Sequence, residues 1–431
     1  CPSRRVGIVN PEHPPRLGAP PPCYTCPMRV VMRSTRFDRC SWPAVLAVLE
    51  QGLVPRRVQA GFASSLDDVR IGDLVLYSFA SSMAETVRSE IEALRTRLGD
   101  ALLSIAGGPH PSADPDGVLA MGFRWVCVGE AGPSFVAVAR SLLDGTVPAP
   151  GALHDPPQEL DRYPAWPTHT ELFAPVEISR GCPHACAYCQ TPSLFGRRMR
   201  HRSVEALEST LRRGVEAGHR YTRFVSPNAF AYGSSDGRTP DIAAVRRLLE
   251  AARRSGMSGV FLGTFPSEVR PESVSDELLC LVRDLCDNRS IAVGLQSGSD
   301  RVLRAIRRGH TAGQGREAIA RIASRGFEPR VDFIFGLPGE TDGDRAATRE
   351  MVERLASEYG ARVHLHRFVA LPGTLFAGQP PAPLDSVTEK WIADQVGLGR
   401  VAGVKRRAPS TRIVRSSNWR EMRLAPGPGR D

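Results

Sequence analysis

The 431-residue sequence has no uncharged apolar run that approaches the ~18 residues needed to span a membrane. Its first residues lack the basic-then-apolar order of a signal peptide. Lysine is scarce, since it occurs only at Lys390 and Lys405, so arginine carries nearly all of the positive charge. We therefore expect a cytoplasmic protein with no membrane segment.

The charge balance leaves one class of partner open. Lysine and arginine total 56 against 46 acidic residues, which gives a net charge of +10. Such an excess suits a polyanion such as RNA, but the arginines are spread along the chain, as a GC-rich genome also produces. The densest stretches, 196–202 and 405–407, suit either anionic cofactor groups or solvated surface. Nucleic acid therefore stays an alternative partner that the charge does not favour.

The chain length and the cysteine content limit the possible domain organisation and cellular compartment. A chain of 431 residues exceeds one ordinary hydrophobic core, and 42% hydrophobic residues is a globular content. Ten cysteines, three of them clustered, fit a reducing compartment better than a disulfide framework. We predict a first domain over 1–150, a proline-rich linker over 151–171, a second domain over 172–375 and an extension over 376–431.

The first domain reads as a doubly wound α/β unit. Apolar runs such as 74–77, 102–106 and 125–128 alternate with helical patterns such as 83–98, which predicts a parallel sheet buried on both faces. Ligands of such sheets bind beyond the carboxyl ends of the strands. No G-x-G-x-x-G run follows a first strand, which argues against NAD. The small or polar residues at the expected strand ends include Ser78, Gly107, Gly108, Gly129 and Glu130.

A proline-rich stretch separates the first expected strand, 6–9, from Trp42. A loop of that length inside a compact domain is typically functional or a lid. Cys23 and Cys26 lie in it and could form a redox or metal pair, or neither.

The second domain repeats a strand-helix alternation six times. Six units of that size predict a parallel, curved sheet whose site lies at the carboxyl ends of the strands. The strands are expected near 176–180, 221–226, 259–264, 291–296, 330–336 and 362–368.

Cys182, Cys186 and Cys189 follow the first of these strands within eight residues. Thiolates so close together can face one soft metal centre. A closed zinc site or an ordinary four-iron cluster takes four protein ligands, and this loop supplies three. One position is left open, unless His184 or a remote cysteine completes a zinc site.

The C-x3-C-x2-C spacing, with Tyr188 before the last cysteine, resembles the signature of the radical S-adenosylmethionine (SAM) superfamily. The resemblance implies a partial (β/α)6 barrel and a [4Fe-4S] cluster bound by the three cysteines. It also implies that SAM binds the open iron and is cleaved to a 5'-deoxyadenosyl radical. An electron donor such as flavodoxin or ferredoxin would be the partner.

Further motifs resemble the branch of this superfamily that includes methylthiotransferases and many cobalamin-dependent members. Ser226 and Asn228 stand in place of a Gly-Gly-Glu stretch whose glutamate is absent here. Read singly, such motifs also suit turns and helix caps, as Glu340 and Thr341 do. The residues that the resemblance assigns to SAM are Tyr188, Ser226, Asn228, Ser267, Gln296, Ser297 and Gly336.

The first domain resembles the cobalamin-binding domain that precedes many radical SAM domains. The resemblance rests on 77–79, on 107–111 and on Gly129 with Glu130. No D-x-H-x-x-G stretch occurs, so no family histidine would coordinate cobalt from below, and the nucleotide tail would insert beside the sheet. The alternative is a domain that binds no cofactor. The implied cobalamin contacts are Ser78, Gly107, Gly108, Gly129 and Glu130.

These readings predict a radical SAM enzyme, with cobalamin-dependent methylation or rearrangement of a small-molecule or peptide substrate. One alternative is methylthiolation of tRNA or protein; a non-enzyme alternative is a cobalamin- or redox-responsive binding protein. No catalytic residue is assigned. Cys280 and Cys286 fit a helix core, whereas His364 and His366 share one face of the sixth strand and could contact substrate or donate protons.

Overall fold

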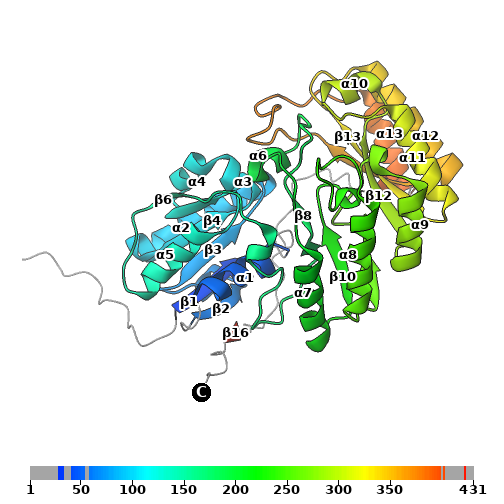
Figure 1. Cartoon of the computed structure of the whole chain (residues 1–431). Coiled ribbons are helices and arrows are strands. Elements are labelled where there is room, and N and C mark those ends of the chain that lie inside the picture. Colours follow the sequence, from blue (N-terminus) through cyan, green and yellow to red (C-terminus); the bar gives the residue numbers. More distant parts are fainter. Residues whose placement is uncertain (1–27, 34–39, 54–57, 399–400, 403–421, 424–431) are drawn as a thin grey trace, which may run out of the picture.

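The computed structural model describes residues 28–33, 40–53, 58–398, 401–402 and 422–423. The described chain forms two parallel sheets with their helices, and the two units lie beside each other (Figure 1). They meet where α6 (Thr191–Phe195) packs against α3 (Pro109–Ala113). The strand expected at 6–9, the cysteines at 23 and 26, and the basic stretch 405–407 lie outside the described residues.

The first sheet has the strand order β16-β2-β1-β3-β4-β5-β6. All neighbouring strands are parallel except β16, which pairs antiparallel with β2. The order 2-1-3-4-5 within it is doubly wound, with its reversal between β1 and β3, and ligands of such sheets bind beyond the carboxyl edge. The strands are β1 (Met28–Arg33), β2 (Val58–Ala63), β3 (Leu74–Ser78), β4 (Leu103–Gly107), β5 (Trp125–Val128), β6 (Gly151–His154) and β16 (Met422–Arg423).

Helices cover both faces of this sheet (Figure 1). Neighbouring residues of β1 serve opposite cores, since Met32 packs in the core of the first helix pair and Val31 in that of the second. Burial on both faces explains the continuous apolar runs, and the predicted doubly wound fold is confirmed. The first pair is α1 (Trp42–Leu53) with α5 (Pro133–Leu143), and the second is α2 (Ala84–Leu98) with α4 (Pro115–Met121).

Two strands of the first sheet lie where the sequence predicted other structure. β1 falls in the stretch read as a proline-rich loop, because its apolar core of two valines and a methionine is short and lies between Arg29 and Arg33. β6 falls in the stretch expected to be a linker and pairs in parallel with β5. The first sheet therefore extends past residue 150.

The second sheet is curved and follows chain order. β7, β10 and β11 are parallel neighbours, as are β12, β13, β14 and β15. A parallel bridge between Val269 and Val293 joins the two groups. The predicted partial (β/α)6 barrel is confirmed, with its six expected strands at β7 and β10 to β14, and β15 adds a short strand beside β14 that was not predicted. The strands are β7 (Val176–Glu177), β10 (Tyr221–Val225), β11 (Gly259–Phe261), β12 (Ser290–Gln296), β13 (Glu328–Phe335), β14 (Arg362–Arg367) and β15 (Val401–Ala402).

The barrel helices lie outside the curved sheet (Figure 1). Side chains such as Phe333 and Leu365 are buried against them, so the alternate residues of the same strands face the lumen. Most of these helices start at a serine, threonine or aspartate whose side chain accepts a backbone N–H of the first turn. The helices of this unit include α7 (Val204–Glu216), α8 (Ile242–Arg254), α9 (Asp276–Leu285), α11 (Ala312–Ser324), α12 (Asp342–Tyr359) and α13 (Ser386–Gly397).

Across the described ranges, none of the helices combines the length and the apolar character that crossing a membrane requires.

Candidate functional site

The three clustered cysteines lie on a loop closed by a short antiparallel hairpin, β8 (Ser179–Arg180) and β9 (Arg200–His201). The Cys182 amide donates to the Gly196 carbonyl at 3.1 Å, and the Ala187 amide donates to the Ile306 carbonyl at 2.9 Å. Gly181 has φ +86°, and a Cβ there would collide with the Arg198 carbonyl. The backbone of the loop is thus held at its base and at its middle.

Two buried arginines face one of these thiols. The guanidinium of Arg270 lies 3.7 Å from Cys186 Sγ, and that of Arg308 lies 3.6 Å from it. Their positive charges stabilise a thiolate or an anionic iron-sulfur centre. Arg270 also donates to Glu272 at 2.5 Å and to the Arg308 carbonyl, so its hydrogen bonds go to protein groups. Neither arginine was predicted to face the cysteines.

The donor set can be compared with the centre that the resemblance implies. Among the residues whose placement is described, no three His, Cys, Asp or Glu side chains converge closely enough to hold a single metal ion. In a four-iron cluster each cysteine binds a different iron, so its ligands surround the cluster and do not meet at one point. Three thiols on one pinned loop, faced by two cations, fit such a cluster.

Three of the residues assigned to SAM form a buried network beneath the carboxyl ends of β10 and β11. The Ser226 amide donates to Ser267 Oγ at 2.8 Å, and Ser267 Oγ donates to the Phe224 carbonyl at 2.8 Å. Asn228 Oδ1 accepts from the Arg270 amide at 3.2 Å. These hydrogen bonds hold the loops that follow β10 and β11 in place. The three side chains therefore support the backbone of these loops.

The other residues assigned to SAM lie at strand ends or on the cysteine loop. Gln296 ends β12 with φ +79°, a strained value for a non-glycine residue, which is typical of functional sites. Ser297 is fully buried and contacts Thr348. Gly336 has φ +81°, and the Ala382 carbonyl lies 3.2 Å from where its Cβ would be. Tyr188 lies on the cysteine loop and packs against the apolar cluster that includes Leu303 and Phe368, and burial raises the pKa of its hydroxyl.

An acidic and imidazole cluster lies in the barrel lumen. Asp332 Oδ1 is 3.2 Å from His364 Nδ1 and 3.6 Å from His366 Nε2. The imidazole side chains of His364 and His366 are 40% and 52% exposed, so both are open to molecules in the lumen. Burial and the neighbouring Asp332 raise the pKa of Glu268, and Asp332 raises that of His366. The predicted common face of the two histidines is therefore the lumen.

This cluster is linked to the cysteine loop. The Arg308 guanidinium that faces Cys186 also donates to the Gly294 carbonyl at 2.5 Å. A Cβ on Gly294 would collide with the Glu268 carboxylate and would lie 2.7 Å from Arg308. Glycine at this point of β12 therefore lets Glu268 and Arg308 meet beside the loop.

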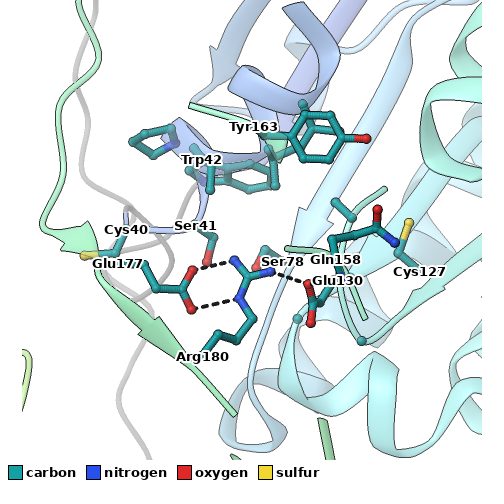
Figure 2. A pocket seen from close by; sticks show the side chains of 18 of the residues that line it. Cys40, Ser41, Trp42, Ser78, Cys127, Glu130, Gln158, Tyr163, Glu177 and Arg180 are labelled. Atoms are coloured by element: carbon teal, nitrogen blue, oxygen red, sulfur yellow. Dashed lines mark hydrogen bonds and ion pairs between the residues drawn. The ribbon is translucent and has the colours of Figure 1, made fainter. Parts of the chain in front are cut away.

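A pocket of about 400 Å³ lies between the carboxyl edge of the first sheet and the hairpin that carries the cysteines (Figure 2). Its depth is apolar, with Val48 of α1, Ile105 of β4 and Phe135 of α5 among its walls. Gly108 has φ +94°, and its Cβ would lie 3.0 Å from the Phe79 amide nitrogen, so only glycine fits. The five residues predicted to contact cobalamin all line this pocket: Ser78, Gly107, Gly108, Gly129 and Glu130.

The carboxylate of Glu130 is turned to arginines of the hairpin. It accepts from Arg180 at 2.6 Å, and Arg180 also pairs with Glu177 (Figure 2). Arg200 donates to the same carboxylate. Burial opposes its charge, but the hydrogen bonds from Arg200 and the charge of Arg180 hold the pKa of Glu130 below its ordinary value. Glu130 therefore lines the pocket as one member of an ion network.

Comparison with curated proteins gives partial matches. An uncharacterized protein of Methanopyrus kandleri is 29% identical over 213 residues, covering 48% of this chain and 40% of the relative. A tRNA-2-methylthio-N(6)-dimethylallyladenosine synthase of Acidithiobacillus ferrooxidans is 32% identical over 258 residues, covering 57% and 53%. The chain thus spans about half the length of the curated relatives it matches.

Solved structures share the arrangement of both units. The methyltransferase TsrM from Kitasatospora setae, described with cobalamin and a [4Fe-4S] cluster bound, superposes with a TM-score of 0.60 at 15% identity, over 82% of this chain and 77% of its own. The cobalamin-dependent enzyme OxsB with aqua-cobalamin gives 0.57 at 14% identity, over 88% and 57%. At these identities the likeness concerns the fold.

The family comparison concerns the barrel. The model of the radical SAM superfamily matches residues 176–352, which include the cysteine loop and strands β7 to β13. The barrel segment 176–352 of this chain therefore matches the radical SAM superfamily.

Proposed function

We propose that the chain is an enzyme that binds a [4Fe-4S] cluster through Cys182, Cys186 and Cys189 and cleaves SAM there. We further propose that it binds cobalamin in the pocket of the first sheet and methylates or rearranges a small-molecule or peptide substrate. The observation that carries the proposal is the position of that pocket, which faces the hairpin of the cysteine loop. When bound, the cluster would supply the electron that cleaves SAM and cobalamin would carry the methyl group.

The residues of the chain have separate tasks in this proposal. The three thiolates hold the cluster, while Arg270 and Arg308 offset its negative charge. The apolar depth of the pocket and the glycines at its edge would hold cobalamin, because residues without a side chain would let a bulky ring approach the backbone. A flavodoxin or ferredoxin would supply the electron.

A second candidate is methylthiolation of tRNA or protein, which the curated relatives favour through their names. An auxiliary iron-sulfur cluster in the first domain would need cysteines spread one per strand end. Within the described part of the first domain the cysteines are Cys40 and Cys127, and Cys127 lies inside β5. This arrangement supports the cobalamin proposal over the second candidate.

The test is anaerobic reconstitution of the full chain with iron and sulfide, followed by dithionite, SAM and hydroxocobalamin. The proposal predicts about four irons per chain, formation of 5'-deoxyadenosine or methionine, and one bound corrinoid. About eight irons without bound corrinoid would favour methylthiolation. A bound corrinoid without any SAM cleavage would instead indicate the cobalamin-responsive binding protein.

A further inference from the structure

Glu130 occupies an unusual place for a residue at a cofactor pocket. It follows β5 at the carboxyl edge of the first sheet, yet both of its carboxylate oxygens face the hairpin of the other unit. Arg180 ends β8 and Arg200 begins β9, so one carboxylate holds both strands of that hairpin. Gln158 adds a backbone N–H to Glu130 at 3.3 Å.

The network is buried, so its members cannot exchange partners with water freely. The side chains of Glu130 and Arg200 are 4% and 3% exposed, and that of Arg180 is 20% exposed. Removal of one partner from such a group leaves an uncompensated buried charge, which forces the remaining groups to move toward water. A change at Glu130 therefore acts on the position of the hairpin.

The hairpin leads directly to the cluster ligands. Arg180 precedes Gly181 and Cys182, and the Cys182 amide donates to the carbonyl of Gly196, which follows α6 on the way back to β9. Arg200 also donates to the Phe195 carbonyl at 3.1 Å, at the end of α6. Short, rigid connections thus join the Glu130 carboxylate to the thiol of Cys182.

The first unit also contacts α6, the helix between the cysteine loop and β9. Gly129 has φ +79°, and its Cβ would lie 3.2 Å from the carbonyl of Leu194 in α6. The backbone of the pocket edge and the segment after the cysteine loop are therefore packed against each other beside the ion network.

We propose that Glu130 is a positioning residue that holds the cysteine loop at a fixed place over the pocket, and thereby sets the distance between the cluster and the pocket's occupant. This inference rests on the proposed function for the identity of the two cofactors. It replaces the expectation of Glu130 as a cobalamin contact, because its carboxylate is occupied by Arg180 and Arg200.

The test measures the magnetic interaction between two cofactors in the full-length holoenzyme. Dithionite reduces the cluster and converts added hydroxocobalamin to cob(II)alamin, so each carries an unpaired electron whose mutual splitting in the EPR spectrum depends on distance. Glu130→Gln keeps the size of the side chain and removes its charge. We expect this variant to retain its iron and its corrinoid and to show a shifted or lost splitting.

Arg200→Gln is a second variant, since Arg200 belongs to the network but is absent from the described lining of the pocket. It should change the splitting and leave the Kd for hydroxocobalamin unaltered. Glu208→Gln is the matched control, because Glu208 also bridges two arginines, Arg212 and Arg254, but on the outer helix α7. It should leave the splitting and both cofactors unchanged.

Two results would overturn the inference. One is a weaker hydroxocobalamin Kd in Glu130→Gln with the splitting of the bound complex unchanged, which identifies a direct contact. The other is an unchanged splitting in Arg200→Gln. Failure of the proposed function is distinguishable, because wild-type protein would then bind no corrinoid or form no cluster, and no splitting would be seen in any variant.

Discussion

Arg308 shows how single residues join the parts of the site. Its guanidinium contacts Cys186 at one end and shares the space over Gly294 with Glu268. The cysteine motif could be recognised from the sequence because its three cysteines lie close together in the chain. The arginines that face Cys186 are 84 and 122 residues away, and no local pattern marks such partners.

Loss of one thiol should abolish the cluster. Cys186→Ala removes one of three ligands, so we expect loss of the iron-sulfur absorbance and of SAM cleavage after anaerobic reconstitution. Cys280→Ala is the control, because the Cys280 sulfur also lies near two arginines, 3.7 Å from Arg283 and 3.2 Å from Arg325, but on helix α9. Equal iron contents in the two variants would contradict the assignment.

The positive charge of Arg308 should raise the midpoint potential of the cluster. Arg308→Gln removes a buried positive charge, so the reduced, more negative cluster loses stabilisation and its midpoint potential should fall. A unit charge at about 7 Å and an effective dielectric of about 20 corresponds to a change on the order of 100 mV. Redox titration followed by EPR measures it, and Arg308→Lys should restore most of the potential. An unchanged potential in Arg308→Gln would contradict this electrostatic role.

His366 should titrate above its ordinary value of 6.5, because Asp332 stabilises the imidazolium. The groups that face it are Asp332, Glu268 and, on the same strand, His364. A raised folded-state pKa stabilises the fold fully below the unfolded pKa, and this contribution disappears as the pH rises through the raised value. Asp332→Asn should lower the midpoint, which histidine-resolved NMR or the pH dependence of chemical modification reports. A His366 midpoint that is the same in wild type and Asp332→Asn would refute the interaction.

At the scale of elements, the hairpin of β8 and β9 determines where the cysteines lie. The strand and helix pattern of the barrel was predictable, because each apolar run is followed by a capped amphipathic helix in regular order. The hairpin was not predicted, since two strands of two residues each leave no periodicity. β1 was missed for a related reason, because arginines interrupt its short apolar run.

Two glycines of the hairpin give a matched pair of tests. Both Gly181 and Gly196 have positive φ, but a Cβ at Gly181 would collide with the Arg198 carbonyl, whereas nothing lies within 4 Å at Gly196. Gly196→Ala should cost roughly 1–3 kcal/mol of unfolding free energy for its backbone alone, because φ 80° and ψ 171° lie in a region essentially restricted to glycine. Gly181→Ala should cost more and also lower cluster occupancy, as denaturant titration and iron analysis would show. Equal losses of stability and of iron in the two variants would contradict a close packing of Gly181 against the Arg198 carbonyl.

At the scale of the whole molecule, two parallel sheets present their carboxyl edges to one region. The doubly wound order was predictable from the alternation of apolar runs, and the five predicted pocket residues meet because each follows a strand at the same edge. The contacts between the units were not predictable, because Glu130 and Arg180 are 50 residues apart and belong to different sheets. The proposed chemistry depends on this juxtaposition.

The central claim is that the pocket of the first sheet holds cobalamin beside the cluster. Gly107→Leu tests it, because Gly107 has ordinary backbone angles and its Cβ would have only ordinary contacts, the nearest at 3.7 Å from Cys127, so a leucine would fit the backbone and fill the pocket. The measurement is a spectral titration of the reconstituted full chain with hydroxocobalamin. We expect one corrinoid per wild-type chain and none in Gly107→Leu, with the cluster intact in both. No binding to wild type, or undiminished binding to the variant, would contradict it.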